Sequence, residues 1–147
     1  MKVFVGSDHN GYNLKPKLVS FLQKQGYDVV DDSTGPLNPD DDYPAFAKKV
    51  VMDMQTSGDA DARGILICGS GQGMCMAANR FKGIRACLGY DRESVRAARN
   101  DDDANVLCVA VRTLEADTAF NLVETLLITP FAAAPRYSRR IQEMDQM

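Results

Sequence analysis

Short apolar runs and helical stripes of apolar residues alternate five times along this chain. A continuous apolar run is typical of a parallel strand that is covered on both faces. Such runs occupy residues 2–7, 27–30, 64–68, 84–88 and 105–111. The spacing of apolar residues between the runs predicts helices over residues 14–24, 43–56, 71–80, 91–100 and 114–128, with a basic final helix from Arg136.

This alternation predicts an α/β fold with one five-stranded parallel sheet and helices on both of its faces. The 147 residues suit one domain spanning positions 1–147. Ligands of such folds bind at the carboxyl edge of the sheet. Polar and reactive residues follow the predicted strands at that edge, namely Ser7 to His9, Asp31 to Thr34, Cys68 to Ser70, and Tyr90 with Asp91. This placement indicates an enzyme rather than a scaffold.

The most distinctive stretch is the junction Cys68-Gly69-Ser70-Gly71-Gln72-Gly73 after the third strand. Alternating glycines let backbone N–H groups approach a ligand, so the loop is suited to cradle a phosphate or to stabilise an oxyanion. We expect the following helix N-terminus to lower the pKa of the Cys68 thiol. The spacing is not the dinucleotide fingerprint, although Asp91, about 20 residues further on, keeps a nucleotide-binding interpretation open.

A histidine next to an aspartate and a run of three aspartates are two further candidates for site chemistry. His9 is the only histidine, and Asp8 before it can orient or charge its ring. Three consecutive carboxylates, Asp101 to Asp103, fit a solvated turn or a metal site. Because no second cluster with ligand spacing accompanies them, we expect no metal.

Arginines provide candidate phosphate ligands. Arg136 and Arg140 are four residues apart and share one face of the last helix, where two guanidinium groups can clamp a phosphate. The same spacing fits a solvated basic end of the chain equally well. Arg112, at the end of the fifth strand, is a further phosphate or interface candidate.

Composition and charge limit the classes of function. The chain has 17 basic and 20 acidic side chains and a net charge of −3, which argues against a broad nucleic-acid surface. No apolar run approaches the roughly 20 residues of a membrane span, and the first residues run straight into a strand, so we expect no membrane association and no signal peptide. The four cysteines form no CxxC pair, and we expect reduced thiols in a cytoplasmic protein.

Six motifs resemble, in chain order, those of the type B ribose-5-phosphate isomerases, a family that includes the galactose-6-phosphate isomerase subunits. They are Asp8-His9-Asn10-Gly11, Asp42-Tyr43-Pro44, Ile67-Cys68-Gly69-Ser70-Gly71-Gln72-Gly73, Ala77-Ala78-Asn79, Lys82-Gly83-Ile84-Arg85-Ala86 and Ala104-Asn105-Val106-Leu107. The resemblance covers essentially the whole chain. It implies a Rossmann-like three-layer domain without cofactor or metal, and a homodimer or dimer of dimers whose active sites are shared between subunits.

The resemblance also implies a reaction, the aldose–ketose isomerisation of a phosphorylated sugar through an enediolate. Cys68 resembles the base that moves a proton between C1 and C2, in the branch of the family that does not use a glutamate at the position of Met74. The loop from Gly69 to Gly73, with Ser70 contributing, resembles the oxyanion cradle. Asp8 resembles the residue that contacts the sugar hydroxyls, and Tyr43 matches a tyrosine that lines the pocket.

The implied phosphate ligands are His9, Arg136 and Arg140, and Arg112 matches another arginine of the shared site. This chain departs from the family at two places. Where relatives have His-Asn, with a histidine linked to opening the sugar ring, this chain has Asp101-Asp102. The family's Gly-Gly-Arg-His is Ala134-Pro135-Arg136-Tyr137 here.

The missing histidine leaves two hypotheses. A four-carbon sugar 4-phosphate cannot close a five-membered ring, because its suitable hydroxyl is esterified, and it would need no ring-opening group. The carboxylates of Asp101 and Asp102 would also repel a second anionic group. Alternatively, Asp101 takes over ring opening and ribose 5-phosphate remains the substrate.

A function of another class also fits the pattern: a non-catalytic sugar-phosphate or nucleotide-binding protein that kept the fold and the phosphate clamp. Only an enzyme needs the Cys68 thiolate. The intact cysteine and glycine loop therefore favour the isomerase.

Overall fold

The computed structural model describes residues 1–147 and contains one five-stranded sheet in which all neighbouring strands are parallel. The strands are β1 (Lys2–Ser7), β2 (Asp28–Asp31), β3 (Arg63–Cys68), β4 (Ala86–Gly89) and β5 (Val106–Ala110). Their order across the sheet is β2-β1-β3-β5-β4. After β2 the chain therefore returns past β1 to form β3, so β1 and β3 flank the switch point at which open α/β sheets bind ligands.

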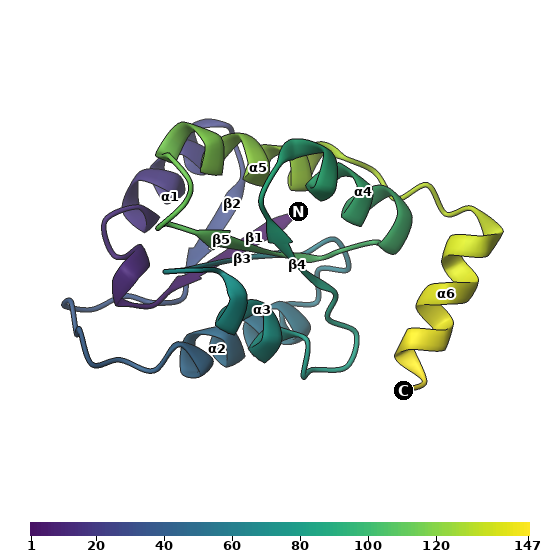
Figure 1. The fold of residues 1–147 in the computed structure, drawn as a ribbon, viewed down its shortest axis with the longest axis horizontal. Helices are drawn as coiled ribbons and strands as arrows, with labels where there is room; N and C mark the ends of the chain where they lie inside the picture. Colours follow the sequence, from purple (N-terminus) through teal and green to yellow (C-terminus); the bar gives the residue numbers. More distant parts are fainter.

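Helices cover both faces of the sheet, as predicted (Figure 1). One face carries α1 (Lys15–Lys24), α4 (Arg92–Asp102) and α5 (Ala116–Ile128), and the other carries α2 (Tyr43–Thr56) and α3 (Gln72–Ala78). Side chains of β3 alternate between two cores: Ile65 and Ile67 pack under α1, α4 and α5, whereas Leu66 and Cys68 pack under α2 and α3. Because β3 contributes side chains to a core on each face of the sheet, almost all of its residues are apolar.

The predicted α/β class and the five strands are confirmed, with small shifts at element ends. The fourth strand begins at Ala86 rather than residue 84, because Ile84 closes a turn through its N–H bond to the Phe81 carbonyl, 3.1 Å away. Helix α4 runs two residues beyond its predicted end and stops at Asp103, which adopts a left-handed conformation with φ 49°. The Asp103 carboxylate pairs with Arg85 and with the buried Arg99, both at 2.6 Å. Asp103 is therefore a structural member of the acidic cluster.

The last helix, α6 (Pro135–Asp145), stands apart from the rest of the chain (Figure 1, yellow). None of its residues is buried. Its main neighbour is α4, and a backbone bond of 3.0 Å from Ala132 N–H to the Asn100 carbonyl holds the segment before it. No helix of the structure has the length and apolar character needed to cross a lipid bilayer.

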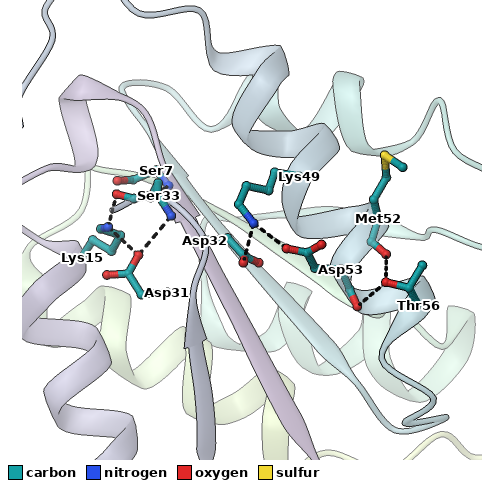
Figure 2. Close-up of polar contacts among 9 residues, drawn as sticks. All are labelled: Ser7, Lys15, Asp31, Asp32, Ser33, Lys49, Met52, Asp53 and Thr56. Atoms are coloured by element: carbon teal, nitrogen blue, oxygen red, sulfur yellow. Dashed lines mark hydrogen bonds and ion pairs between the residues drawn. The ribbon is translucent and has the colours of Figure 1, made fainter. Parts of the chain in front are cut away.

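Two polar clusters lie at the end of β2, where a long loop begins (Figure 2). In the first, Lys15 Nζ donates to Asp31 Oδ1 at 2.6 Å and to the Ser33 carbonyl at 2.5 Å. The Ser7 N–H donates to Ser33 Oγ at 2.9 Å. These bonds attach the start of the loop to β1 and α1.

In the second cluster, Lys49 Nζ lies 3.2 Å from Asp32 Oδ1 and 2.6 Å from Asp53 Oδ2. The Asp32 side chain is only 2% exposed, and its Oδ2 has no hydrogen-bond partner. Burial, with a smaller contribution from Asp53, raises the pKa of Asp32 from 3.8 to about 6, although Lys49 opposes the shift. The folded chain thus holds an incompletely satisfied carboxyl group beside β2.

We expect Asp32→Asn to remove most of the pH dependence of stability between about pH 4 and about pH 6. In that window the folded chain binds more protons than the unfolded chain, because the folded pKa of Asp32 is the higher one. The free energy of unfolding of the unmodified protein should therefore fall by about 1–3 kcal/mol as the pH rises through it. Urea titrations at several pH values measure this slope. An equally steep slope in Asp32→Asn would contradict the prediction.

Candidate active site

The carboxyl ends of β1 and β3 bring Asp8 and Cys68 to the same edge of the sheet. Ser7 pairs with Ile67 in the register of these strands, and the Asp8 N–H extends the pairing by donating to the Ile67 carbonyl at 3.2 Å. Asp8 is 6% exposed, and Cys68 is 4% exposed. The Cys68 Sγ accepts a hydrogen bond of 3.1 Å from the Gly71 N–H.

Opposing effects act on the Cys68 thiol. Burial is the largest and raises its pKa, and the negative charge of Asp8 acts in the same direction. Hydrogen bonds from the backbone N–H groups of Met74, Gly71 and Ser70 lower the pKa but do not outweigh burial. The expectation that the pKa of Cys68 is lowered was therefore wrong for the free protein. The loop does supply N–H groups to the thiol, but the same site excludes water, and the effect of burial is the larger one.

Each glycine of the loop lies where another element leaves no room for a side chain. A Cβ at Gly69 would fall 2.9 Å from the Arg112 guanidinium carbon, and one at Gly73 would fall 2.7 Å from the Tyr43 ring. Gly71 has φ 75°, and a Cβ there would collide with Leu88. Arg112 and Tyr43 therefore lie against the loop. Ser70, between these glycines, is exposed, and its Oγ accepts a weak bond of 3.4 Å from the Gln72 N–H.

A polar cluster surrounds His9 in the short 3₁₀ helix η1 (His9–Gly11). His9 Nδ1 lies 2.7 Å from Asp41 Oδ1, and its Nε2 lies 2.9 Å from Asn10 Nδ2. Asn10 Nδ2 also donates to Asp8 Oδ2 at 3.3 Å, and Asn10 Oδ1 accepts from Arg112 Nη2 at 3.4 Å. Asn10 thus connects the histidine, the buried carboxylate and the arginine.

Asp41 is a site residue that the sequence analysis missed. It belongs to the long loop after β2, whose residues line a cavity of about 300 Å³ with Asp8 and His9. Donor atoms of Asp8, His9 and Asp41 lie within 4.8 Å of one another, close enough to hold a metal ion. Because His9 Nδ1 and Asp41 Oδ1 already bond to each other, we interpret the group as a hydrogen-bonded cluster. The length and acidity of the loop were the only sequence signal for it.

Comparisons with known proteins identify the family. The model of the ribose/galactose isomerase family matches residues 3–144. The chain belongs to this family. A probable ribose-5-phosphate isomerase B of Mycoplasma pneumoniae is 39% identical over 95% of this chain and 90% of its own length. The ribose-5-phosphate isomerase B of Mycolicibacterium paratuberculosis is 35% identical over 96% of this chain and 87% of its own.

Solved structures agree with this membership. The ribose-5-phosphate isomerase B of Clostridium thermocellum superposes with a TM-score of 0.92 at 40% identity, covering 99% of this chain and 96% of its own. The Mycoplasma genitalium enzyme, solved with bound ribulose-5-phosphate, gives a TM-score of 0.91 at 36% identity, covering 99% and 94%. The chain is thus a sugar-phosphate isomerase, as the resemblance implied.

A single copy of the chain does not bring all the predicted site residues together. Asp101 and Asp102 lie at the end of α4, which starts at the carboxyl edge of the sheet and returns to its amino edge. Arg136 and Arg140 lie on α6, on the side of the molecule opposite η1 (Figure 1). These four side chains are therefore remote from Cys68 within the chain.

Near the amino edge, Asp101 faces the start of α6. Its pKa is lowered mainly by the Asn100 amide, which donates to Asp101 Oδ1 at 2.7 Å, and also by Tyr137 and Arg136. Arg136 stacks on the Tyr137 ring, 4.7 Å from its centroid, and donates to its hydroxyl at 2.8 Å. Asp101 is therefore a carboxylate with reduced basicity.

Two other residues considered from the sequence have structural roles. Asp91 accepts a bond of 2.7 Å from the Ser94 N–H and so caps α4, a role that explains this residue without a nucleotide. Met74 is fully buried in the core under α2 and α3, consistent with its not serving as a base.

Gly71→Ala should destabilise the protein by about 2–4 kcal/mol, because the left-handed backbone disfavours a Cβ and the new methyl group collides with Leu88. We also expect turnover to fall at least about tenfold, since the shifted loop withdraws an N–H donor from Cys68. Gly83→Ala is the matched control: φ is 76°, but nothing lies within 4 Å of the added atom. It should cost only about 1–2 kcal/mol and leave turnover unchanged. Equal losses in both variants by urea unfolding would contradict the packing argument.

Proposed function

We propose that this isomerase interconverts an aldose phosphate and its ketose isomer, with Cys68 as the base. The observation that carries the proposal is the buried thiol at the switch point, within reach of the loop N–H groups and beside Asp8. The reaction needs a base next to a carbonyl carbon and donors for the developing oxyanion. Both parts belong to one strand–turn–helix unit here.

In this mechanism the Cys68 thiolate takes the proton from the carbon next to the carbonyl group of the open-chain sugar. The electron pair of that C–H bond forms the enediolate, whose negative oxygen is held by the N–H groups of the loop from Gly69 to Gly73 and by Ser70. The thiol then returns the proton to the former carbonyl carbon, while the hydroxyl proton of the carbon that was deprotonated passes to the former carbonyl oxygen. Atoms and charge therefore balance, and no other reactant is required. Asp8 binds the sugar hydroxyls, and Tyr43 lines the pocket over Gly73.

We further propose that two copies of the chain build each site. His9 and Arg112 lie near Cys68 in one copy, and Arg136 with Arg140 reach the substrate phosphate from a second copy. The exposed, weakly packed α6 supports this arrangement, since its arginines have no route to Cys68 of their own chain. Asp101 and Asp102 would enter the site from the same second copy. A homodimer is the smallest assembly that meets this need, and a dimer of dimers preserves it.

Mixing two inactive variants tests the sharing. Cys68→Ala and the double variant Arg136→Met/Arg140→Met should each lose turnover, but subunits mixed equally by refolding should regain about one quarter of it. Half of the dimers are then mixed, and one site in each of these is intact. Cys68→Ala mixed with Asp8→Asn is the control, because both groups come from the same copy and no intact site forms. No recovery in the first mixture would contradict shared sites.

For the substrate, we propose an open-chain sugar phosphate that needs no ring-opening histidine, most simply one with four carbons. The lowered pKa of Asp101 supports this, because a weakly basic carboxylate is poorly suited to removing a hydroxyl proton from a closed ring. Ribose 5-phosphate is the competing substrate, favoured by the names of the relatives, with Asp101 opening the ring.

A turnover screen over four-, five- and six-carbon aldose and ketose phosphates separates these substrates. We expect the four-carbon pair to be turned over fastest. Its kcat/KM should rise with pH and still be rising at the ordinary pKa of a cysteine thiol, because burial raises the pKa of Cys68. Cys68→Ala should lower turnover by at least about a thousandfold and leave ligand binding nearly intact. Turnover of ribose 5-phosphate at about 10 per second would instead favour the five-carbon substrate. In that case Asp101→Asn should abolish it.

The four cysteines are free thiols, the state that a reducing compartment maintains. This supports a cytoplasmic location for the enzyme.

A further inference from the structure

The structure assigns a role to Asp41 that deepens the proposed function. We propose that Asp41 is a positioning residue that fixes a proton on His9 Nδ1, favours the imidazolium form and directs Nε2 to the substrate phosphate. The inference rests on the proposed role of His9 as a phosphate ligand. The two side chains are far apart in sequence, and only the folded loop after β2 brings them together.

A single carboxylate oxygen holds His9 at two points. Asp41 Oδ1 lies 2.7 Å from the ring Nδ1 and accepts the His9 backbone N–H at 3.2 Å. Asp41 is itself held by a turn, in which its N–H donates to the Asn38 carbonyl at 3.2 Å, and its side chain is 13% exposed. The imidazole therefore has one preferred orientation, with Nδ1 toward the loop.

The opposite ring nitrogen points toward the site. Nε2 lies 2.9 Å from Asn10 Nδ2, and the orientation of that amide is set by its neighbours: Nδ2 faces the Asp8 carboxylate, and Oδ1 faces the Arg112 guanidinium. In the free protein Nε2 is thus an acceptor, and the ring proton lies on Nδ1. A phosphate that displaces the Asn10 amide would meet Nε2 and stabilise a second proton there.

The charges around His9 favour that second proton. The hydrogen bond to Asp41 is the largest cause of its raised pKa, the charges of Asp8 and Asp41 act in the same direction, and Arg112 with desolvation opposes them. Arg112 approaches the same cluster through Asn10, so a cation and an imidazolium would converge on one anion. Asp41 offsets part of their mutual repulsion.

Nitrogen-15 NMR tests this proposal directly, because His9 is the only histidine of the chain and its two ring nitrogens report the tautomer and the pKa. In the unmodified protein the neutral ring should carry its proton on Nδ1. Asp41→Asn keeps an oxygen for that proton but removes the charge, and it should lower the pKa of His9 by about 0.5–1 unit. Asp41→Ala should in addition lose the Nδ1–H preference. Asp40→Asn, with the same charge change in the same loop, should move the pKa of His9 far less. An unchanged pKa of His9 in Asp41→Asn would overturn the proposal.

Ligand binding provides the second readout, with inorganic phosphate as the probe. At a pH above the pKa of His9 in both the unmodified protein and Asp41→Asn, the variant should bind phosphate about 3–10-fold more weakly. At a pH below both of these pKa values, the two dissociation constants should become equal. With a sugar phosphate that is turned over, KM should change in the same way and kcat by less than about twofold. A ratio independent of pH would also overturn the role of charge. Neither the titration of His9 nor phosphate binding requires turnover, so a failed isomerase assay would not be mistaken for failure of this inference.

Discussion

The burial of the Cys68 thiol at the end of a central, fully covered strand is the constraint on which the site depends. Because β3 is enclosed by helices on both faces, its last side chain is only 4% exposed. Burial raises the pKa of the thiol, and backbone N–H groups of the following turn partly offset the shift. Such a group is a weak nucleophile at rest but a strong base once it loses its proton, which suits the removal of a proton from carbon.

At the same edge of the sheet, short-range contacts hold the other residues of the site in place. Arg112 lies on Gly69 and Tyr43 lies on Gly73, so the absent side chains of the loop make room for residues of other elements. Asn10 links Asp8, His9 and Arg112 into one hydrogen-bonded array. A change at any of these residues would therefore alter both packing and polarity at the site.

A single copy of the chain holds only part of the site that the family resemblance implies. The returning direction of α4 carries Asp101 and Asp102 away from the carboxyl edge, and α6 carries two arginines outward without burying a residue. The acidic run also divides by function. Asp103 ends α4 and pairs with Arg85 and Arg99, whereas Asp101 faces Tyr137 and Arg136. Asp101 stands where the family resemblance implies a histidine, and it therefore shares its surroundings with Arg136, one of the proposed phosphate ligands.

The sequence by itself determined the α/β class, the five parallel strands and the position of Cys68, because hydrophobic periodicity and strand–turn–helix motifs are local properties. Its motifs also sufficed to recognise the family. Only the tertiary structure decided the direction in which the pKa of Cys68 shifts. Burial raises this pKa by more than the N–H groups of the following turn lower it, and only the turn can be recognised from the sequence. The pairing of Asp41 with His9 was also beyond prediction, because it depends on how a long irregular loop folds back toward the 3₁₀ helix after β1. The same holds for Asp101 and Arg136, whose distance from Cys68 follows from the directions of α4 and α6 rather than from any pattern of residues.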